Sequence, residues 1–336
     1  LLGCSSQPKA ETHTAASEAA TGRPSPSAET TADPLPSWND SPRKQAILDF
    51  VTDVTTADGE HFVPAEERIA VFDNDGTLWV EQPVYTQLAF AIDRVKAQAS
   101  SHPEWRRTQP FQAVLEDDLE ALKASGHEGL FELVMATHSG MTTEQFQLLV
   151  EQWLASSRHP KFDRRYDKLV YAPMLELLSY LRVQGFKTFI VSGGGVDFMR
   201  VFAEQAYGIP PEQVIGSAMV TEFKLEDGVP VIERKPELLY LDDKAVKPVM
   251  IQQVIGRRPI LAAGNSDGDL QMLQWSTAGS GKRLGLFVHH TDAEREYSYD
   301  RKSAVGRFDQ ALDLAPDNGW LIVDMKADWN RVFPPK

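Results

Sequence analysis

Hydrophobic positions along the chain form short runs in some places and longer periodic stretches in others. Apolar runs of strand length suit strands buried on both faces of a parallel sheet, and they occupy 68–72, 187–191, 260–263 and 283–290. Apolar residues three and four positions apart predict amphipathic helices, which occupy 41–54, 171–186 and 247–256. Asp227 and Gly228 predict the turn of a β-hairpin. The alternation of strand and helix predicts an α/β fold with a doubly wound, mainly parallel sheet.

The segment between the first predicted strand and the helix at 171–186 has a different pattern. Its aromatic residues and leucines recur at helical spacing, and no strand is predicted within it. We therefore expect an inserted helical cap over 83–165. The core is then expected to comprise 41–82 and 166–336.

Composition separates the first forty residues from the rest of the chain. From Ser5 to about Asn39, Ser, Thr, Ala, Pro and Glu predominate. Such a segment buries too little apolar surface to offset its chain entropy, so 1–40 is expected to be a disordered tether. The opening residues LLGC resemble the end of a bacterial lipoprotein signal peptide, which implies cleavage before Cys4 and a lipid on its sulfur. This resemblance predicts an extracytoplasmic protein, periplasmic or at the cell surface, whose membrane contact is through that lipid alone.

Charge and length narrow the classes of partner. The formal net charge of −14 lacks the basic footprint of a nucleic-acid-binding protein, so no nucleic-acid partner is expected. An acidic protein still binds phosphate where local cations converge. With 336 residues, 42% of them hydrophobic, the chain can form one large domain or two smaller ones. Apart from any lipid, no apolar run is long enough to span a membrane.

Reactive or phosphate-binding residues follow three of the predicted strands. These motifs are Asp73-Asn74-Asp75-Gly76-Thr77, Ser192-Gly193-Gly194-Gly195 and Gly264-Asn265-Ser266-Asp267-Gly268-Asp269. Lys247 opens the predicted helix between the last two motifs. Ligands bind at the carboxyl ends of the strands in such sheets, so these groups are expected to form one site.

In this order, the motifs resemble those of the haloacid dehalogenase superfamily, in particular its phosphatase branch and the phosphoserine-phosphatase-like subgroup. The resemblance covers about 66–325 and implies a Rossmann-like core, a cap, and hydrolysis of a small phosphomonoester through an aspartyl-phosphate. It is consistent with Asp73 as the nucleophile and Asp75 as the general acid and then base. The expected phosphate contacts and charge neutralisation involve Ser192, Gly193, Thr77, Glu81 and Lys247, with Lys244 as the alternative lysine.

A carboxylate that attacks a phosphate dianion meets like-charge repulsion, so nearby cations are required. Mg²⁺ answers this requirement, and the resemblance implies a site formed by Asp73, the backbone carbonyl of Asp75, Asn265 and Asp269. The family pattern has Asp in place of Asn265. An amide oxygen can bind Mg²⁺ but brings no charge, and Asp267 is an extra candidate to restore it.

Other interpretations stay open. A dehalogenase would use the same nucleophile, but Asp75 argues against it, and Asn265 alone suggests a lipid-anchored binding protein without catalysis. Asp269 can form a capping box with Ser266, the three glycines can form a turn, and Lys247 and Glu81 can be solvated. Structural roles are also open for residues near or outside the motifs, which are Trp79, His138, His289, His290 and the basic segment 157–165.

Overall fold

The structure is a computed structural model that describes residues 32–335. Cys4, the proposed lipid attachment site, lies outside the described residues. A compact unit begins at Pro34, earlier than the predicted boundary at 41. Leu35 and Trp38 are buried in the core, and Nε1 of Trp38 donates a hydrogen bond to the carbonyl of Pro173 at 3.0 Å. The predicted tether is therefore wrong for 34–40, because two large apolar residues in this polar segment find a packing surface.

The described unit is organised around an eight-stranded sheet in the order β2-β5-β4-β3-β1-β6-β7-β8. The strands are β1 (Ile69–Phe72), β2 (Met141–Thr142), β3 (Lys187–Gly195), β4 (Val214–Glu226), β5 (Val229–Tyr240), β6 (Leu261–Gly264), β7 (Leu284–His289) and β8 (Leu321–Asp324). In the part of the sheet that runs β4-β3-β1-β6-β7-β8, all neighbouring strands are parallel. By contrast, β5 pairs antiparallel with β4 and with β2. The mostly parallel sheet confirms the predicted fold class.

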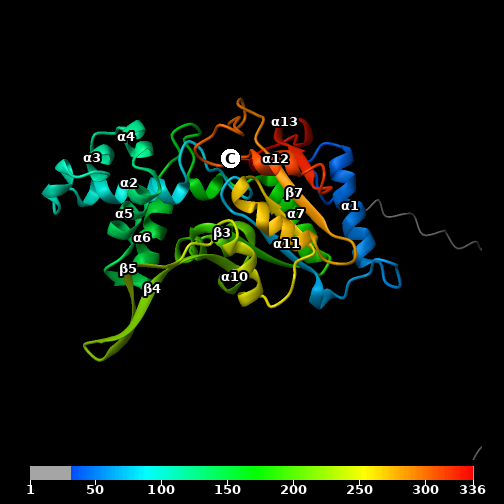
Figure 1. The fold of residues 1–336 in the computed structure, drawn as a ribbon, viewed down its shortest axis with the longest axis horizontal. Helices are drawn as coiled ribbons and strands as arrows, with labels where there is room; N and C mark the ends of the chain where they lie inside the picture. The colour runs from blue at the N-terminus through cyan, green and yellow to red at the C-terminus, as the bar shows by residue number, and fades with distance from the viewer. Residues whose placement is uncertain (1–31, 336) are drawn as a thin grey trace, which may run out of the picture. The chain divides into compact units, whose positions relative to one another are not determined.

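Helices cover both faces of this sheet (Figure 1). They are α1 (Pro42–Thr55), α2 (Thr86–Gln98), α3 (Phe111–Leu115), α4 (Leu119–Ala124), α5 (Gly126–His138), α6 (Thr143–Ser156), α7 (Ala172–Val183), α8 (Val196–Arg200), α9 (Ala203–Tyr207), α10 (Val246–Val254), α11 (Leu270–Thr277), α12 (Gln310–Leu314) and α13 (Met325–Asp328). Ala70 and Phe72 pack with α1 and α7, whereas Ile69 and Val71 pack with α10 and α11. Alternate residues of β1 therefore enter opposite core layers, as a doubly wound sheet requires.

The insertion between β1 and α7 is mainly helical and contains α2 to α6. It has a small apolar core of its own, formed by Val95, Trp105, Phe111, Ala113, Val114, Leu122 and Leu133. Figure 1 shows these helices (cyan to green) gathered beside β4 and β5. The insertion also contains β2, which was not predicted, because a two-residue strand has no readable alternation and depends on its pairing with β5.

The β4–β5 hairpin turns at Asp227 and Gly228, whose φ angles of +50° and +82° suit a tight hairpin turn. The hairpin is longer than predicted, and β4 begins next to β3 in the parallel part of the sheet. It thus connects the core with the edge that contacts the helical insertion. None of the helices within residues 32–335 has the length and apolarity needed to span a bilayer.

Candidate active site

The site lies where the chain leaves the central strands. β1 is hydrogen-bonded to β3 on one side and to β6 on the other, so their carboxyl ends are neighbours. The backbone N–H of Asp73 donates to the carbonyl of Ala263 at 2.9 Å, which fixes the first residue after β1 against β6. Asp73 and Asn265 directly follow β1 and β6, Ser192 lies in the last part of β3, and all three are buried. The pairing of distant strands therefore assembles the three motifs.

Lys247 is the lysine that enters the site. It is buried, and its Nζ donates to Oδ1 of Asp73 at 2.8 Å and to Oδ1 of Asp269 at 2.6 Å. Lys244 is exposed, and its backbone bonds to the carbonyl of Gly268 instead. The interpretation of Lys247 as a solvated side chain is wrong, because the first turn of α10 points it between two carboxylates.

Burial shifts the protonation of both acids in the loop after β1. It raises the pKa of Asp73 to about 8; the nearby charge of Asp269 adds to this rise, and Lys247 opposes it. Burial also raises the pKa of Asp75 to about 6, although the hydrogen bond from Nε1 of Trp79 to Oδ1 at 2.9 Å acts in the other direction. Asp75 therefore titrates near the pH at which a general acid and base is effective.

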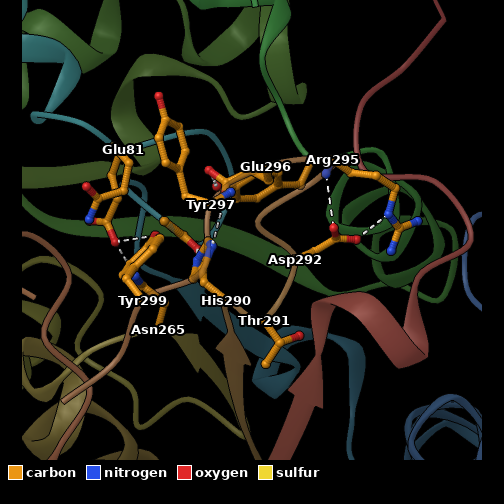
Figure 2. Close-up of polar contacts among 12 residues, drawn as sticks. Glu81, Asn265, His290, Thr291, Asp292, Arg295, Glu296, Tyr297 and Tyr299 are labelled. Carbon is orange, nitrogen blue, oxygen red and sulfur yellow. Dashed lines mark hydrogen bonds and ion pairs between the residues drawn. The ribbon is translucent and has the colours of Figure 1, made fainter. Parts of the chain in front are cut away.

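A chain of side-chain contacts holds the loop after β6 against the loop after β1. Thr77 is fully buried and donates its hydroxyl to Oδ1 of Asn265 at 3.2 Å. Nδ2 of Asn265 donates to Oε1 of Glu81 at 2.6 Å, and the hydroxyl of Tyr299 donates to the same oxygen at 2.7 Å. Figure 2 shows Glu81, Asn265 and Tyr299 side by side. Glu81 is only 2% exposed, so its interpretation as a solvated acid is wrong.

His290 holds the loop after β1 in place. It is buried, and its Nε2–H donates to the carbonyl of Gly76 at 2.7 Å, while Nδ1 lies 3.0 Å from Oε2 of Glu296 (Figure 2). Oε1 of Glu296 in turn accepts from the hydroxyl of Tyr171 at 3.3 Å. His290 is therefore a positioning residue. The irregular segment after β7, which contributes Glu296 and Tyr299, carried no periodic signal from which these contacts could be found.

Asp269 combines two roles that the sequence left open. Its Oδ2 accepts from the backbone N–H groups of Asn265 at 3.0 Å and Ser266 at 3.1 Å, which completes the predicted capping box, while Oδ1 accepts from Lys247. Asp267 does not join the site. Its Oδ1 accepts from the backbone N–H of Asp309 at 3.0 Å and of Ala311 at 2.9 Å at the start of α12. It is therefore not placed to restore the charge that Asn265 lacks.

The three glycines that end β3 bring backbone close to the acids. Ser192 is buried, and its hydroxyl oxygen accepts from the N–H of Gly194 at 3.2 Å. A Cβ atom at Gly194 would lie 3.6 Å from Oδ2 of Asp75, so this segment faces the proposed acid and base. Gly195 donates its N–H to Oε1 of Gln87 on α2 at 2.7 Å, which connects the insertion to the site. The glycines therefore do more than form a turn.

The sequence profile of haloacid dehalogenase-like hydrolases matches residues 70–274, which is more than half of the chain and includes all of these motifs. The chain belongs to the haloacid dehalogenase-like hydrolase family. No curated protein sequence matches this hydrolase.

Solved structures show a related fold. A conserved protein of unknown function from Anaerococcus prevotii is 17% identical, with a TM-score of 0.51, and the match covers 74% of this chain and 86% of that one. A protein of unknown function from Bordetella pertussis is 14% identical, with coverage of 77% and 99% and a TM-score of 0.49. A phosphoserine phosphohydrolase-like protein from Francisella tularensis is 18% identical, with coverage of 66% and 87% and a TM-score of 0.39. At these identities, similarity bears on the fold alone.

The oxygen donors of this hydrolase fit a hard divalent cation such as Mg²⁺. Asp73, Asp75 and Asp269 are three acids near one buried cation, Lys247, among the described residues. Burial raises the pKa of both Asp73 and Asp75, and for Asp73 the charges of Asp269 and Asp75 add to this rise. Within 32–335, no three His, Cys, Asp or Glu side chains are arranged to hold a metal by themselves. A Mg²⁺ ion would therefore also use the backbone carbonyl of Asp75 and the amide oxygen of Asn265.

The remaining candidates of the hydrolase have packing roles or lie outside the cluster of acids. Trp79 stacks on Phe202 with ring centroids 4.3 Å apart. In the basic segment, buried His159 contacts the carbonyl of Gln82 through Nε2 at 2.7 Å, and Arg165 pairs with Asp167 at 2.5 Å. His289 lies 3.6 Å from Asp300 at the end of β7. His138 is buried in the insertion and lines a cavity next to the glycines that end β3.

Proposed function

We propose that this hydrolase cleaves small phosphomonoesters through an aspartyl-phosphate on Asp73, with Mg²⁺ as its cofactor. The observation that carries the proposal is the pairing of Asp73, held by Lys247 at 2.8 Å, with a second acid two residues later whose pKa is raised to about 6. A dehalogenase has no use for a proton donor at this position, because its halide leaving group needs no proton. Phosphoester cleavage does need one, since the leaving alkoxide is a strong base.

In the first step, a carboxylate oxygen of Asp73 attacks phosphorus. Oδ1 accepts a hydrogen bond from Lys247, whereas no described residue donates to Oδ2. Oδ2 is therefore the available nucleophile. The bond between phosphorus and the leaving oxygen breaks with its electron pair on that oxygen. Protonated Asp75 then supplies the proton that completes the alcohol.

In the second step, Asp75 acts as a base. It takes a proton from a water molecule whose oxygen attacks phosphorus, and the bond between phosphorus and Asp73 breaks. Inorganic phosphate leaves, the carboxylate of Asp73 is restored, and Asp75 is protonated for the next cycle. The hydrogen bond from Trp79 to Oδ1 of Asp75 leaves Oδ2, the oxygen near Gly194, for these transfers.

The other site residues bind phosphate or position those that do. The hydroxyl of Ser192 and the N–H of Gly193 are the proposed donors to phosphate oxygens, and Lys247 offsets the negative charge. Thr77 and Glu81 act through Asn265, whose amide they orient from both ends. Bound Mg²⁺ would supply positive charge against the phosphate dianion, and Asp73, the carbonyl of Asp75, Asn265 and Asp269 are the groups proposed to hold it.

The proposed setting of the enzyme is extracytoplasmic. A lipid on Cys4 would attach the chain to a membrane, and a small phosphomonoester, rather than nucleic acid, would be its partner. The mass of the mature amino-terminal peptide tests the lipid, because a diacylglycerol adduct on Cys4 is expected and an unmodified cysteine would contradict it.

Hydrolysis of p-nitrophenyl phosphate, with Mg²⁺ and with EDTA, tests the activity. Asp73→Asn is expected to lower turnover by at least about a thousand-fold, because the nucleophile is lost. Asp267→Asn is the matched control, since Asp267 bonds to the start of α12 and its change is expected to leave turnover within about two-fold. Equal turnover in wild type and Asp73→Asn would overturn the mechanism. Halide release from a 2-chloro acid without phosphatase activity would identify a dehalogenase instead.

A further inference from the structure

A cavity of about 460 Å³ lies between the helical insertion and the glycines that end β3. Its apolar wall is formed by Leu130, Val134, Met135, Val196, Met219 and Leu238, which come from α5, α8 and the β4–β5 hairpin. This volume falls in the range of small-molecule sites, which run from roughly 300 to 1,000 Å³. The wall therefore offers a small ligand a mainly apolar environment.

The inner end of the cavity adjoins the proposed phosphate site. Gly193 and Gly195 line the cavity, and they flank Gly194, whose Cβ position is 3.6 Å from Oδ2 of Asp75. Ser192, the proposed phosphate ligand, directly precedes them. A phosphomonoester bound at Ser192 therefore has this cavity as a space for its leaving group.

The charged groups of the wall are already paired or lie at the surface. Arg234 is the one Lys or Arg among the described residues that line the cavity, and it is 4% exposed. Its guanidinium forms an ion pair with Asp197, donates to the carbonyl of His138 at 2.7 Å and lies 4.1 Å from the ring centroid of Phe146. Burial lowers the pKa of His138 to about 3, so this imidazole is neutral. No lining cation is left to bind a carboxylate of a substrate.

We propose that the cavity receives the leaving group of the substrate, and that this leaving group is uncharged and mainly apolar, such as an alkyl or aryl alcohol. The proposal rests on the phosphatase function proposed above. An amino-acid leaving group is excluded by the same contacts, because its carboxylate would enter an apolar wall without a counter-ion. The adjacent Glu128 is exposed at the surface and offers no buried partner for an ammonium group.

Hydrolysis of a series of linear alkyl phosphates by the full chain tests whether the cavity receives the leaving group. The value of kcat/KM is expected to rise about four-fold per added methylene from ethyl to hexyl phosphate, as the transfer of each methylene from water predicts. O-phosphoserine and phosphoethanolamine are expected to be at least about ten-fold poorer than propyl phosphate, since charged groups lose hydration in the cavity. Inorganic phosphate release is the readout throughout.

Two variants of Val134 identify the wall as the cause of this selectivity. Val134→Asp is expected to remove most of the increase of kcat/KM with chain length. Leu148→Asp, at an exposed position of α6, is the matched control that retains this increase. If Val134→Asp does not fold, Val134→Thr preserves the volume and is expected to reduce the increase per methylene. A change of similar size in the Leu148→Asp control would overturn the assignment to this cavity.

Calorimetric titration of Asp73→Asn with ethyl, butyl and hexyl phosphate separates the two proposals. Hydrolysis without preference for longer chains, or with O-phosphoserine as the best substrate, would overturn the cavity proposal and leave the phosphatase function intact. Binding that strengthens with chain length, without hydrolysis by wild type, would support the cavity's ligand class and overturn the phosphatase function. Absence of both hydrolysis and binding would overturn both.

Discussion

Nδ2 of Asn265 donates a hydrogen bond to Oε1 of Glu81 over 2.6 Å. This contact joins the loop after β6 to the segment that follows the two acids after β1. The resemblance to haloacid dehalogenase-like phosphatases leads one to expect an aspartate at this position. Asn265 instead brings an amide with no charge, and the buried carboxyl group of Glu81 stands next to it. Burial raises the pKa of Glu81 well above its usual value, and the amide N–H of Asn265 donates a hydrogen bond to this carboxyl group.

Asn265→Asp is therefore expected to have opposite effects with and without metal. The added charge should tighten Mg²⁺ binding about ten-fold, because carboxylates bind this ion more strongly than amides. Without Mg²⁺, the variant should unfold at lower temperature, since Glu81 would lose the amide N–H that donates to Oε1 and a second acidic group would be buried beside it. Calorimetric titration and thermal unfolding in EDTA measure the two effects. Asn318→Asp on the surface adds the same charge and is expected to change neither, and an unchanged Mg²⁺ affinity in Asn265→Asp would argue against a metal contact at this position.

Replacement of Lys247 and replacement of Lys244 are expected to have different effects on activity and stability. Lys247→Met leaves Asp73 and Asp269 without their shared cation, so kcat/KM should fall by at least about a hundred-fold. The free energy of unfolding in EDTA should fall by roughly 3 kcal/mol, because one partner of a buried ion cluster is lost. Lys244→Met changes an exposed side chain three residues earlier and should alter both quantities little. Equal effects in the two variants would contradict the assignment of Lys247.

Gly76 and Gly140 have the same φ of +71°, so a comparison of their alanine variants measures the cost of overpacking at the site. The added methyl group of Gly140→Ala meets no atom of the described part of the chain within 4 Å, so its cost of roughly 1 kcal/mol in unfolding free energy reflects the left-handed backbone alone. A methyl group at Gly76 would overlap Nδ2 of Asn265 and Oε1 of Glu81. Gly76→Ala is therefore expected to cost at least about 3 kcal/mol and to lower kcat/KM. Urea unfolding gives the comparison, and similar costs would mean that the loops separate without loss of stability.

Asp242 is expected to make stability depend on pH. It is fully buried, neither carboxylate oxygen has a hydrogen-bond partner among residues 32–335, and burial raises its pKa from 3.8 to about 7. The folded chain thus holds this proton more tightly than the unfolded chain. Its stabilising contribution is complete below about pH 4 and is lost as the pH rises through about 7.

Asp242→Asn removes this titration. Between pH 4 and pH 9, wild type is expected to lose roughly 2–4 kcal/mol of unfolding free energy more than the variant does. Urea unfolding at several pH values measures the difference. A variant whose stability falls with pH as steeply as that of wild type would show that Asp242 does not carry this dependence.

The central fold could be predicted because its signals lie in neighbouring residues. The helix predicted at 171–186 forms as α7 (Ala172–Val183), and the apolar run at 68–72 forms β1. Both follow from burial, since a strand covered on two faces must be apolar throughout and an amphipathic helix repeats about every 3.6 residues. The turn at Asp227 and Gly228 follows from the positive φ angles that these residues accept.

The edges of the fold could not be predicted in the same way. β2 has two residues, and its assignment depends on the pairing of Met141 with Arg234. Trp38 lies in a segment rich in polar residues and proline, yet it is buried against a distant part of the chain and pairs with Trp329. Average composition conceals such single anchors, because one large apolar side chain needs only one suitable surface to become ordered.

At the site, the order of residues along the chain already places Asp73 and Asn265 directly after strands, and Ser192 near the end of a strand, that a parallel sheet brings together. Folding alone selects Lys247 over Lys244, turns Asp267 away to α12, buries Glu81 against Asn265 and encloses the cavity. Lys247 and Asp73 are 174 residues apart, and Glu81 and Asn265 are 184 apart. Local pattern determines the conformation of each motif, whereas which side chains meet depends on how distant segments pack.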